Sequence, residues 1–271
     1  MQDHIEIAFT DIQPEQQELL VALLSEAGFE GFEEGDRQLK AFIPQKEYNR
    51  QILHELAFKY QLQFTESIIA AQNWNSTWEA NFPPVIVDDF VVIRADFHPP
   101  VPSVEQEIVI TPKMSFGTGH HATTYMMVQQ MRRLSFTGRQ VFDFGTGTGI
   151  LAILAERLGA AAVDAIDNDD WSIANAAENF ERNHCQNITL RNADAPEPGK
   201  QYDIILANIN KNVILAHLPV LAPQLVPGGT LLLSGLLPED ENEIKEAAAS
   251  YSLRFIEKQE RNNWICLRFN R

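Results

Sequence analysis

The chain has 271 residues, which is enough for one large domain or for two ordinary ones. Hydrophobic residues make up 45% of it and the mean hydropathy is -0.20, so the composition is that of a globular protein with a sizeable core. A formal charge of -16 argues against a broad phosphate-binding surface, which needs clustered Lys and Arg, and favours a basic partner or simply solubility.

The cysteines and the first residues bear on the cellular compartment. Cys185 and Cys266 lie far apart and match no metal-binding spacing, so we expect two buried free thiols in a reducing compartment. The first ten residues lack the basic and apolar regions of a signal peptide, and no run approaches the length of a membrane span. These features predict a cytoplasmic protein that makes no contact with membranes.

Residues 1–70 predict a small domain of their own. Ile5, Ile7 and Phe9 alternate with polar neighbours, as on a half-buried strand, and leucines at helical spacing follow Pro14. The predicted order of elements is β-α-β-β-α-β, which is the ferredoxin-like split arrangement. The six elements are expected at residues 5–9, 14–27, 29–34, 39–43, 48–60 and 62–69.

Residues 71–100 predict a linker with aromatic residues and short strands. We expect Trp74, Trp78 and Phe82 to dock on a neighbouring domain, either at a hinge or as ordinary packing. Residues 85–97 have the pattern of two short strands, and a proline-rich break follows them.

Residues 101–271 predict a second, larger domain, in which apolar strands alternate with helices. This rhythm is typical of a parallel α/β sheet with helices on both faces. Residues 253–269 have the pattern of two strands joined by a polar turn, which predicts an antiparallel pair at the end of the sheet. Strands that lead to polar candidate residues are expected at 140–144, 162–167 and 203–208.

A glycine-rich turn, Asp-Phe-Gly-Thr-Gly-Thr-Gly from Asp143 to Gly149, joins a strand to a helix, where open α/β sheets bind their ligands. Gly145 and Gly147 would permit a tight turn and a close ligand. A dinucleotide fingerprint needs its third glycine where this chain has Ile150, and a Gly-Lys-Ser/Thr phosphate loop is absent. The spacing resembles the S-adenosylmethionine turn of class I methyltransferases, in which Asp143 would face the positive methionyl end. A turn that only serves packing is the alternative.

Three more polar residues follow strands of the same sheet. Asp167 ends the second strand, where a carboxylate can accept both hydroxyls of a ribose, and capping of the next helix is its alternative role. Asp194 follows the third strand, where this superfamily contacts the adenine amino group, and Asn208 ends the fourth. With the terminal antiparallel pair, these residues predict the class I methyltransferase fold, a Rossmann-like seven-stranded sheet.

The segment 114–124, MSFGTGHHATT, resembles a characteristic loop of the bacterial ribosomal protein L11 methyltransferase family. The resemblance extends over nearly the whole chain and includes the tryptophan-rich linker and the glycine turn. It implies that Thr124, Gly145 and Asp167 contact the cofactor and that Asn208 lies near the reacting methyl group. It also implies that a lid over the methionyl part is formed by Phe116, Gly117, Thr118 and Gly119.

Some positions near this loop and after Asn208 depart from the family pattern. His120 stands where the family usually has Thr, and Ala122 where it has Pro. His121 occupies the family's histidine position, where it could be a general base or a loop histidine held by hydrogen bonds. Polar residues follow Asn208, where the family pattern has small or apolar ones. This difference bears on how the substrate binds more than on how the cofactor binds.

The resemblance implies an S-adenosylmethionine-dependent N-methyltransferase that modifies lysine side chains of a basic large-subunit ribosomal protein, with its N-terminal amine as a further candidate. In this family the small N-terminal domain binds the protein substrate. We expect a monomer without direct nucleic-acid binding and without a metal. Methylation of another protein or of a small amine is the alternative, and a non-enzymatic scaffold would not need to bind the cofactor.

Overall fold

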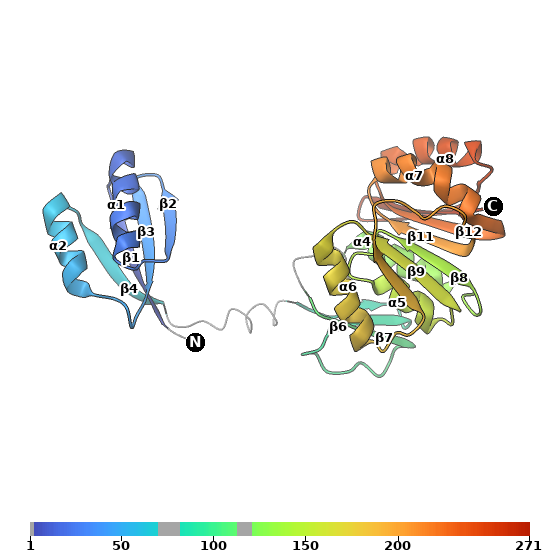
Figure 1. Ribbon diagram of the computed structural model, residues 1–271, viewed down its shortest axis with the longest axis horizontal. Helices are drawn as coiled ribbons and strands as arrows, with labels where there is room; N and C mark the ends of the chain where they lie inside the picture. The colour runs from blue at the N-terminus through green and yellow to red at the C-terminus, as the bar shows by residue number, and fades with distance from the viewer. Residues whose placement is uncertain (1–2, 70–81, 113–120) are drawn as a thin grey trace. The chain divides into compact units, whose positions relative to one another are not determined.

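The computed structural model describes residues 3–69, 82–112 and 121–271 (Figure 1). The chain divides into two compact units, Met1–Phe82 and Pro83–Arg271, each with a hydrophobic core of its own. Within the described ranges, no helix combines the length and the hydropathy that crossing a membrane requires.

The first unit is a four-stranded antiparallel sheet with two helices, and its strand order is β2-β3-β1-β4. Ile5, Ile7 and Phe9 are buried, because successive side chains of a strand point to opposite faces. Gly28, at a φ of 92°, follows the first helix, where a left-handed residue commonly ends a helix. The elements occur in the predicted order as β1 (His4–Thr10), α1 (Pro14–Glu26), β2 (Gly31–Gly35), β3 (Gln38–Pro44), α2 (Arg50–Tyr60) and β4 (Phe64–Ile69).

The second unit begins with a three-stranded sheet. Strand β5 (Val85–Val87) pairs antiparallel with β6 (Val91–Ala95), which pairs parallel with β7 (Gln106–Ile110). The sequence predicted the first two strands but placed them in a linker, residues 71–100, separate from the larger domain. Their pairing with β7 attaches them to the second unit, and the pattern of β7 was not recognised from the sequence.

The main sheet of the second unit has seven strands in the order β10-β9-β8-β11-β12-β14-β13. The strands from β10 to β12 run parallel, whereas β14 runs antiparallel to both of its neighbours, β12 and β13. The terminal antiparallel pair predicted from the sequence is therefore confirmed. The strands are β8 (Gln140–Phe144), β9 (Ala162–Asp167), β10 (Ile188–Asn192), β11 (Tyr202–Asn208), β12 (Leu225–Leu236), β13 (Arg254–Arg261) and β14 (Trp264–Asn270).

Helices cover both faces of this sheet, and α7 and α8 lie together on one of them (Figure 1). Ile214 and Leu218 of α7 and Ile244 of α8 pack with Phe142 and Ile205 of the sheet to form this half of the core. The helices are α4 (Ala122–Arg132), α5 (Ile150–Arg157), α6 (Asp170–Arg182), α7 (Lys211–Gln224) and α8 (Glu241–Ser250), with a short 3-10 helix at Pro238–Asp240.

Both cysteines are free thiols, as the sequence predicted. Cys266 is buried, whereas Cys185 is only half-buried. Desolvation raises the pKa of each thiol to about 12, so neither is a reactive thiolate at neutral pH.

Candidate active site

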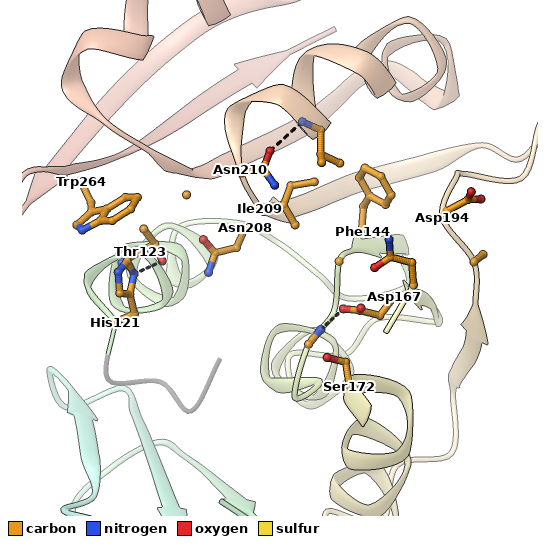
Figure 2. A pocket seen from close by; sticks show the side chains of 16 residues that line it. His121, Thr123, Phe144, Asp167, Ser172, Asp194, Asn208, Ile209, Asn210 and Trp264 are labelled. Atoms are coloured by element: carbon orange, nitrogen blue, oxygen red, sulfur yellow. Dashed lines mark hydrogen bonds between the residues drawn. The ribbon is translucent and has the colours of Figure 1, made fainter. Parts of the chain in front are cut away.

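The carboxyl ends of β8, β9 and β11 border a cavity of about 540 Å³, which lies in the size range of small-molecule and cofactor sites (Figure 2). Asp167 and Asp194 lie toward one end, Trp264 and His121 lie at the other, and Asn208 lies between them (Figure 2). The rest of the wall consists of Thr123, Phe144, Gly145, Gly147, Asn168, Ser172, Ala193, Ile209, Asn210, Val213 and Gly235.

The glycine turn after β8 is tightly enclosed. Gly145, Gly147 and Gly149 have φ angles of 76°, 55° and 82°, in the left-handed region that side chains rarely adopt. A Cβ atom on Gly145 would lie 2.3 Å from Cγ2 of Ile209, and one on Gly149 would lie 2.4 Å from Cε1 of Phe180. Gly145 and Gly147 also line the cavity, whereas the need for glycine at 149 arises from packing against the Phe180 ring.

The carboxylate of Asp167 joins the end of β9 to the turn. One oxygen accepts a hydrogen bond from the backbone N–H of Gly147 at 2.8 Å, and the other accepts from that of Asp169 at 3.1 Å. Asp169 caps helix α6, since its side chain accepts from Ser172 N at 2.9 Å. The cap and the cavity-lining carboxylate are therefore different residues, and Asp167 lines the cavity.

Asp143 lies beneath the turn and is 1% exposed. One carboxylate oxygen accepts a hydrogen bond from the Thr146 hydroxyl at 2.7 Å, and the other, also buried, has no hydrogen-bond partner among the described residues. Burial, reinforced by the charge of nearby Asp167, raises the pKa of Asp143 to about 7, although the bond from Thr146 acts in the opposite direction.

Asn208 ends β11 and contacts helix α4. Its Nδ2 donates to the hydroxyl of Thr124 at 3.3 Å. Its carbonyl oxygen Oδ1 is buried and has no partner in the parts of the chain that the structure describes. Because a buried carbonyl without a hydrogen bond is costly, this oxygen is a candidate acceptor for a ligand.

His121 is the N-cap of α4. Its Nδ1 accepts from the backbone N–H of Thr123 at 3.4 Å and lies 2.7 Å from the Thr123 hydroxyl. The imidazole ring also meets the ring of Trp264 edge to face, with centroids 4.7 Å apart. These contacts fix the ring at the wall of the cavity opposite Asp194 (Figure 2).

A model of the family described as "Ribosomal protein L11 methyltransferase (PrmA)" matches residues 5–271. This chain belongs to that family. A protein named ribosomal protein L11 methyltransferase from Porphyromonas gingivalis is 42% identical over 260 residues, which cover 93% of this chain and 90% of the relative. A protein of the same name from Phocaeicola vulgatus is 37% identical over 276 residues, covering 98% of both chains.

A solved structure is similar too. The ribosomal protein L11 methylase from Lactobacillus delbrueckii subsp. bulgaricus matches with a TM-score of 0.64 and 29% identity, covering 69% of this chain and 97% of that one. The class I methyltransferase fold predicted from the sequence is thus confirmed for the second unit.

Several residues named from the family pattern lie outside the described residues. They are Trp74, Trp78, Phe116, Gly117, Thr118, Gly119 and His120.

Among the cavity residues that the sequence did not indicate, three had no local signal: Ile209, Gly235 and Trp264. Ile209 packs on Gly145, and a Cβ atom on Gly235 would lie 2.3 Å from the backbone oxygen of Ile209. Trp264 is the first residue of β14. These residues meet only because β8, β11, β12 and β14 are consecutive in the sheet. Gly235, which lies near the end of β12 after the apolar run Leu231–Leu233, was the available clue.

The polar residues after Asn208, which depart from the family pattern, have structural roles. The Asn210 side chain caps α7 by accepting from Val213 N at 3.1 Å. Lys211 lies 2.9 Å from a carboxylate oxygen of Asp240 and 3.0 Å from one of Glu243. They therefore stabilise the start of α7, and Asn210 lines the cavity as well.

Proposed function

We propose that this chain transfers methyl groups from S-adenosylmethionine to amino groups of ribosomal protein L11. As a member of the L11 methyltransferase family it is an S-adenosylmethionine-dependent protein methyltransferase. Asn208 is the proposed reaction centre because it lies in the cavity wall and its carbonyl oxygen Oδ1 is buried. Among the described residues, this oxygen has no hydrogen-bond partner.

The cavity residues fit the cofactor chemically. Each oxygen of Asp167 accepts one backbone N–H, which leaves lone pairs for the two hydroxyls of a ribose. Asp194 at the same end would accept the adenine amino group. The carboxyl group of Asp143 lies beneath the turn rather than in the cavity wall, and its negative charge would favour the cationic methionyl end. The backbone of Gly145 and Gly147 offers a wall without side chains. When bound, the cofactor supplies an electrophilic methyl group on a positively charged sulfur.

Asn208 would orient the acceptor amine. A lysine with its usual pKa of about 10.4 is protonated at neutral pH, and an ammonium has no lone pair to attack with. Desolvation in the cavity favours the neutral amine. The Asn208 carbonyl can then accept an amine N–H, while its Nδ2 stays on Thr124, so the lone pair is aimed in one direction.

His121 would serve this reaction by holding the start of α4. The sequence left its role open between a general base and a histidine fixed by hydrogen bonds. The contacts of Nδ1 with Thr123 favour the second role, since they tie the imidazole to the helix turn that carries Thr124.

The proposed acceptor groups and the proposed mode of L11 binding rest on the net charge of the chain and on its membership of the L11 methyltransferase family. Lysine side chains and the N-terminal amine of L11 are the proposed acceptors, and the unit Met1–Phe82 is the proposed binding domain for L11. A charge of -16 supports a basic protein partner, argues against direct nucleic-acid binding and favours a monomer. The two free thiols support a reducing compartment, the cytoplasm.

The test is transfer of a radiolabelled methyl group from S-adenosylmethionine to L11. We expect Asn208→Ala to lower the transfer rate about 100-fold while the cofactor dissociation constant changes by less than about threefold. Asn192→Ala is the matched control. Asn192 donates a hydrogen bond to Asp170 at the surface, so this variant should retain the wild-type rate. Full activity of Asn208→Ala would refute the proposed reaction centre.

A further inference from the structure

Helix α6 carries two buried asparagines, Asn175 and Asn179, and a third, Asn183, is its C-cap. Their four-residue spacing places them on one face of the helix, here called the asparagine face. Asn175 and Asn179 are 0% exposed and Asn183 is 5% exposed. Because burying an amide is costly unless its polar atoms are bonded, the partners of these side chains explain why they are there.

Asn183 bonds the edge of β7 and its own helix. Its Oδ1 accepts from Val109 N at 3.0 Å, and its Nδ2 donates at 2.7 Å to both Val109 O and Asn179 O. One acceptor bond and two donor bonds thus satisfy the amide.

Asn179 makes the same number of bonds but reaches a third element. Its Oδ1 accepts from Thr111 N, just beyond β7, at 2.8 Å, and its Nδ2 donates to Asn175 Oδ1 at 3.2 Å. Nδ2 also donates at 2.8 Å to Thr148 O, inside the glycine turn. The next residue along α6, Phe180, is the one against which Gly149 packs.

The turn is therefore held at two neighbouring residues, Gly147 and Thr148, by a single β-α unit. Asp167, at the end of β9, accepts from Gly147 N, and Asn179, in α6, donates to Thr148 O. Asp167 and Gly147 line the cavity, whereas Asn179 is fully buried behind the turn.

We propose that Asn179 is a positioning residue for the cofactor. Its amide fixes the Thr148 carbonyl, and hence the Gly145–Gly149 turn, relative to the carboxylate of Asp167, and it ties both to the end of β7. The inference rests on the proposed function, in which S-adenosylmethionine occupies the cavity. Asn179 acts through the turn and does not touch the ligand.

The test compares Asn179→Leu with Asn183→Leu in the full chain. Leucine is close in volume, and each substitution removes one acceptor bond and two donor bonds. We expect both to lower the thermal midpoint by similar amounts. By titration calorimetry, we expect Asn179→Leu to raise the dissociation constant of S-adenosylmethionine about tenfold and Asn183→Leu to raise it less than about twofold.

Steady-state kinetics give a second measurement. For Asn179→Leu, KM for the cofactor should rise in the same ratio, while KM for L11 stays at the wild-type value. Equal effects of the two variants on cofactor binding, or no effect of Asn179→Leu, would overturn the inference. Failure of the wild-type chain to bind S-adenosylmethionine would instead contradict the proposed function.

If a leucine variant does not fold, Asn179→Ala and Asn183→Ala give the same comparison. Each leaves space that a water molecule can fill, so the loss of stability is smaller. The same order is expected, with weaker cofactor binding at position 179 than at 183. The reverse order would overturn the inference.

Discussion

Asp143 links the stability of the cofactor-free protein to pH. Its carboxyl group is fully buried, and its pKa is raised from 3.8 to about 7 by desolvation. Because the folded pKa lies above the unfolded one, the folded state holds the proton more tightly. The protonated carboxyl group of Asp143 therefore contributes to the free energy of unfolding. This contribution is fully present below about pH 4 and is lost as the pH rises through about 7.

The first prediction is that Asp143→Asn removes this pH dependence. An amide cannot ionise, so at pH 8 the free energy of unfolding of the cofactor-free variant should exceed that of the wild type by roughly 2–4 kcal/mol. The variant should therefore unfold at a higher temperature. At pH 4 the two proteins should differ little. Thermal unfolding followed between pH 4 and pH 8 measures this difference, and a difference that stays constant with pH would contradict the account.

The same variant should bind S-adenosylmethionine about tenfold more weakly at pH 8, because an ionised carboxylate near the cationic methionyl end is lost. Calorimetric titration of the two proteins provides the comparison. Unchanged affinity would mean that Asp143 serves the turn alone, through its bond from Thr146.

The second prediction concerns His121. Asparagine is a good N-cap, so His121→Asn should keep kcat within about threefold and leave the pH–rate profile unchanged, whereas His121→Ala should lose about 1 kcal/mol of stability. The measurements are the pH dependence of kcat and thermal unfolding. A large fall in kcat for His121→Asn, with loss of one limb of the profile, would instead assign the imidazole to proton removal.

At the level of elements, the glycine turn packs directly against the segment that follows β11. The third prediction is that Gly145→Ala lowers both stability and kcat. Its Cβ atom would lie 2.3 Å from Ile209, the residue after Asn208, and overpacking of this kind costs about 1–3 kcal/mol. A displaced Ile209 would misalign Asn208, so we expect kcat to fall about tenfold.

The matched control is Gly138→Ala. Gly138 has a φ of 75°, close to the 76° of Gly145, but a Cβ atom there meets nothing within 4 Å. The Gly138→Ala variant should lose only about 1 kcal/mol of stability, because the left-handed backbone is strained for a residue with a side chain, and its kcat should be unchanged. Equal losses of kcat in Gly145→Ala and Gly138→Ala would show that the contact with Ile209 has no part in catalysis.

The sequence allowed prediction of features whose signal is local. Alternation at Ile5, Ile7 and Phe9 indicated β1, and the acid–glycine spacing from Asp143 to Gly149 indicated a turn between strand and helix. The position of Asp167 on the strand end was visible in the sequence, whereas the choice of Asp169 as the helix cap came from the structure.

What could not be predicted depends on pairing over long distances in sequence. Strand β7 escaped notice because its attachment to β6, and so the start of the second unit at Pro83, is visible only in the folded sheet. Trp264 joins the cavity because β14 inserts beside β12. Asn179 looked like an ordinary helix residue, since its partners at 111 and 148 lie far away in the chain.

At the scale of the whole molecule, a charge of -16 should influence the encounter with a basic protein more than the binding of the cofactor. The fourth prediction is that kcat/KM for L11 falls several-fold between about 50 and 300 mM salt, as screening shortens the range of attraction. KM for S-adenosylmethionine should change by less than about twofold. Initial rates with each substrate varied in turn provide the measurement, and a salt-independent kcat/KM for L11 would contradict electrostatic attraction.

The division into two units suggests a division of labour, with the cavity formed by residues of the second unit. We propose that this cavity methylates amines of L11. The most direct measurement is the intact mass of L11 after incubation with the full chain and S-adenosylmethionine. We expect a mass that rises in steps of one methyl group, with a rise about 100-fold slower for Asn208→Ala. An unchanged mass, although the chain binds the cofactor, would contradict the proposal.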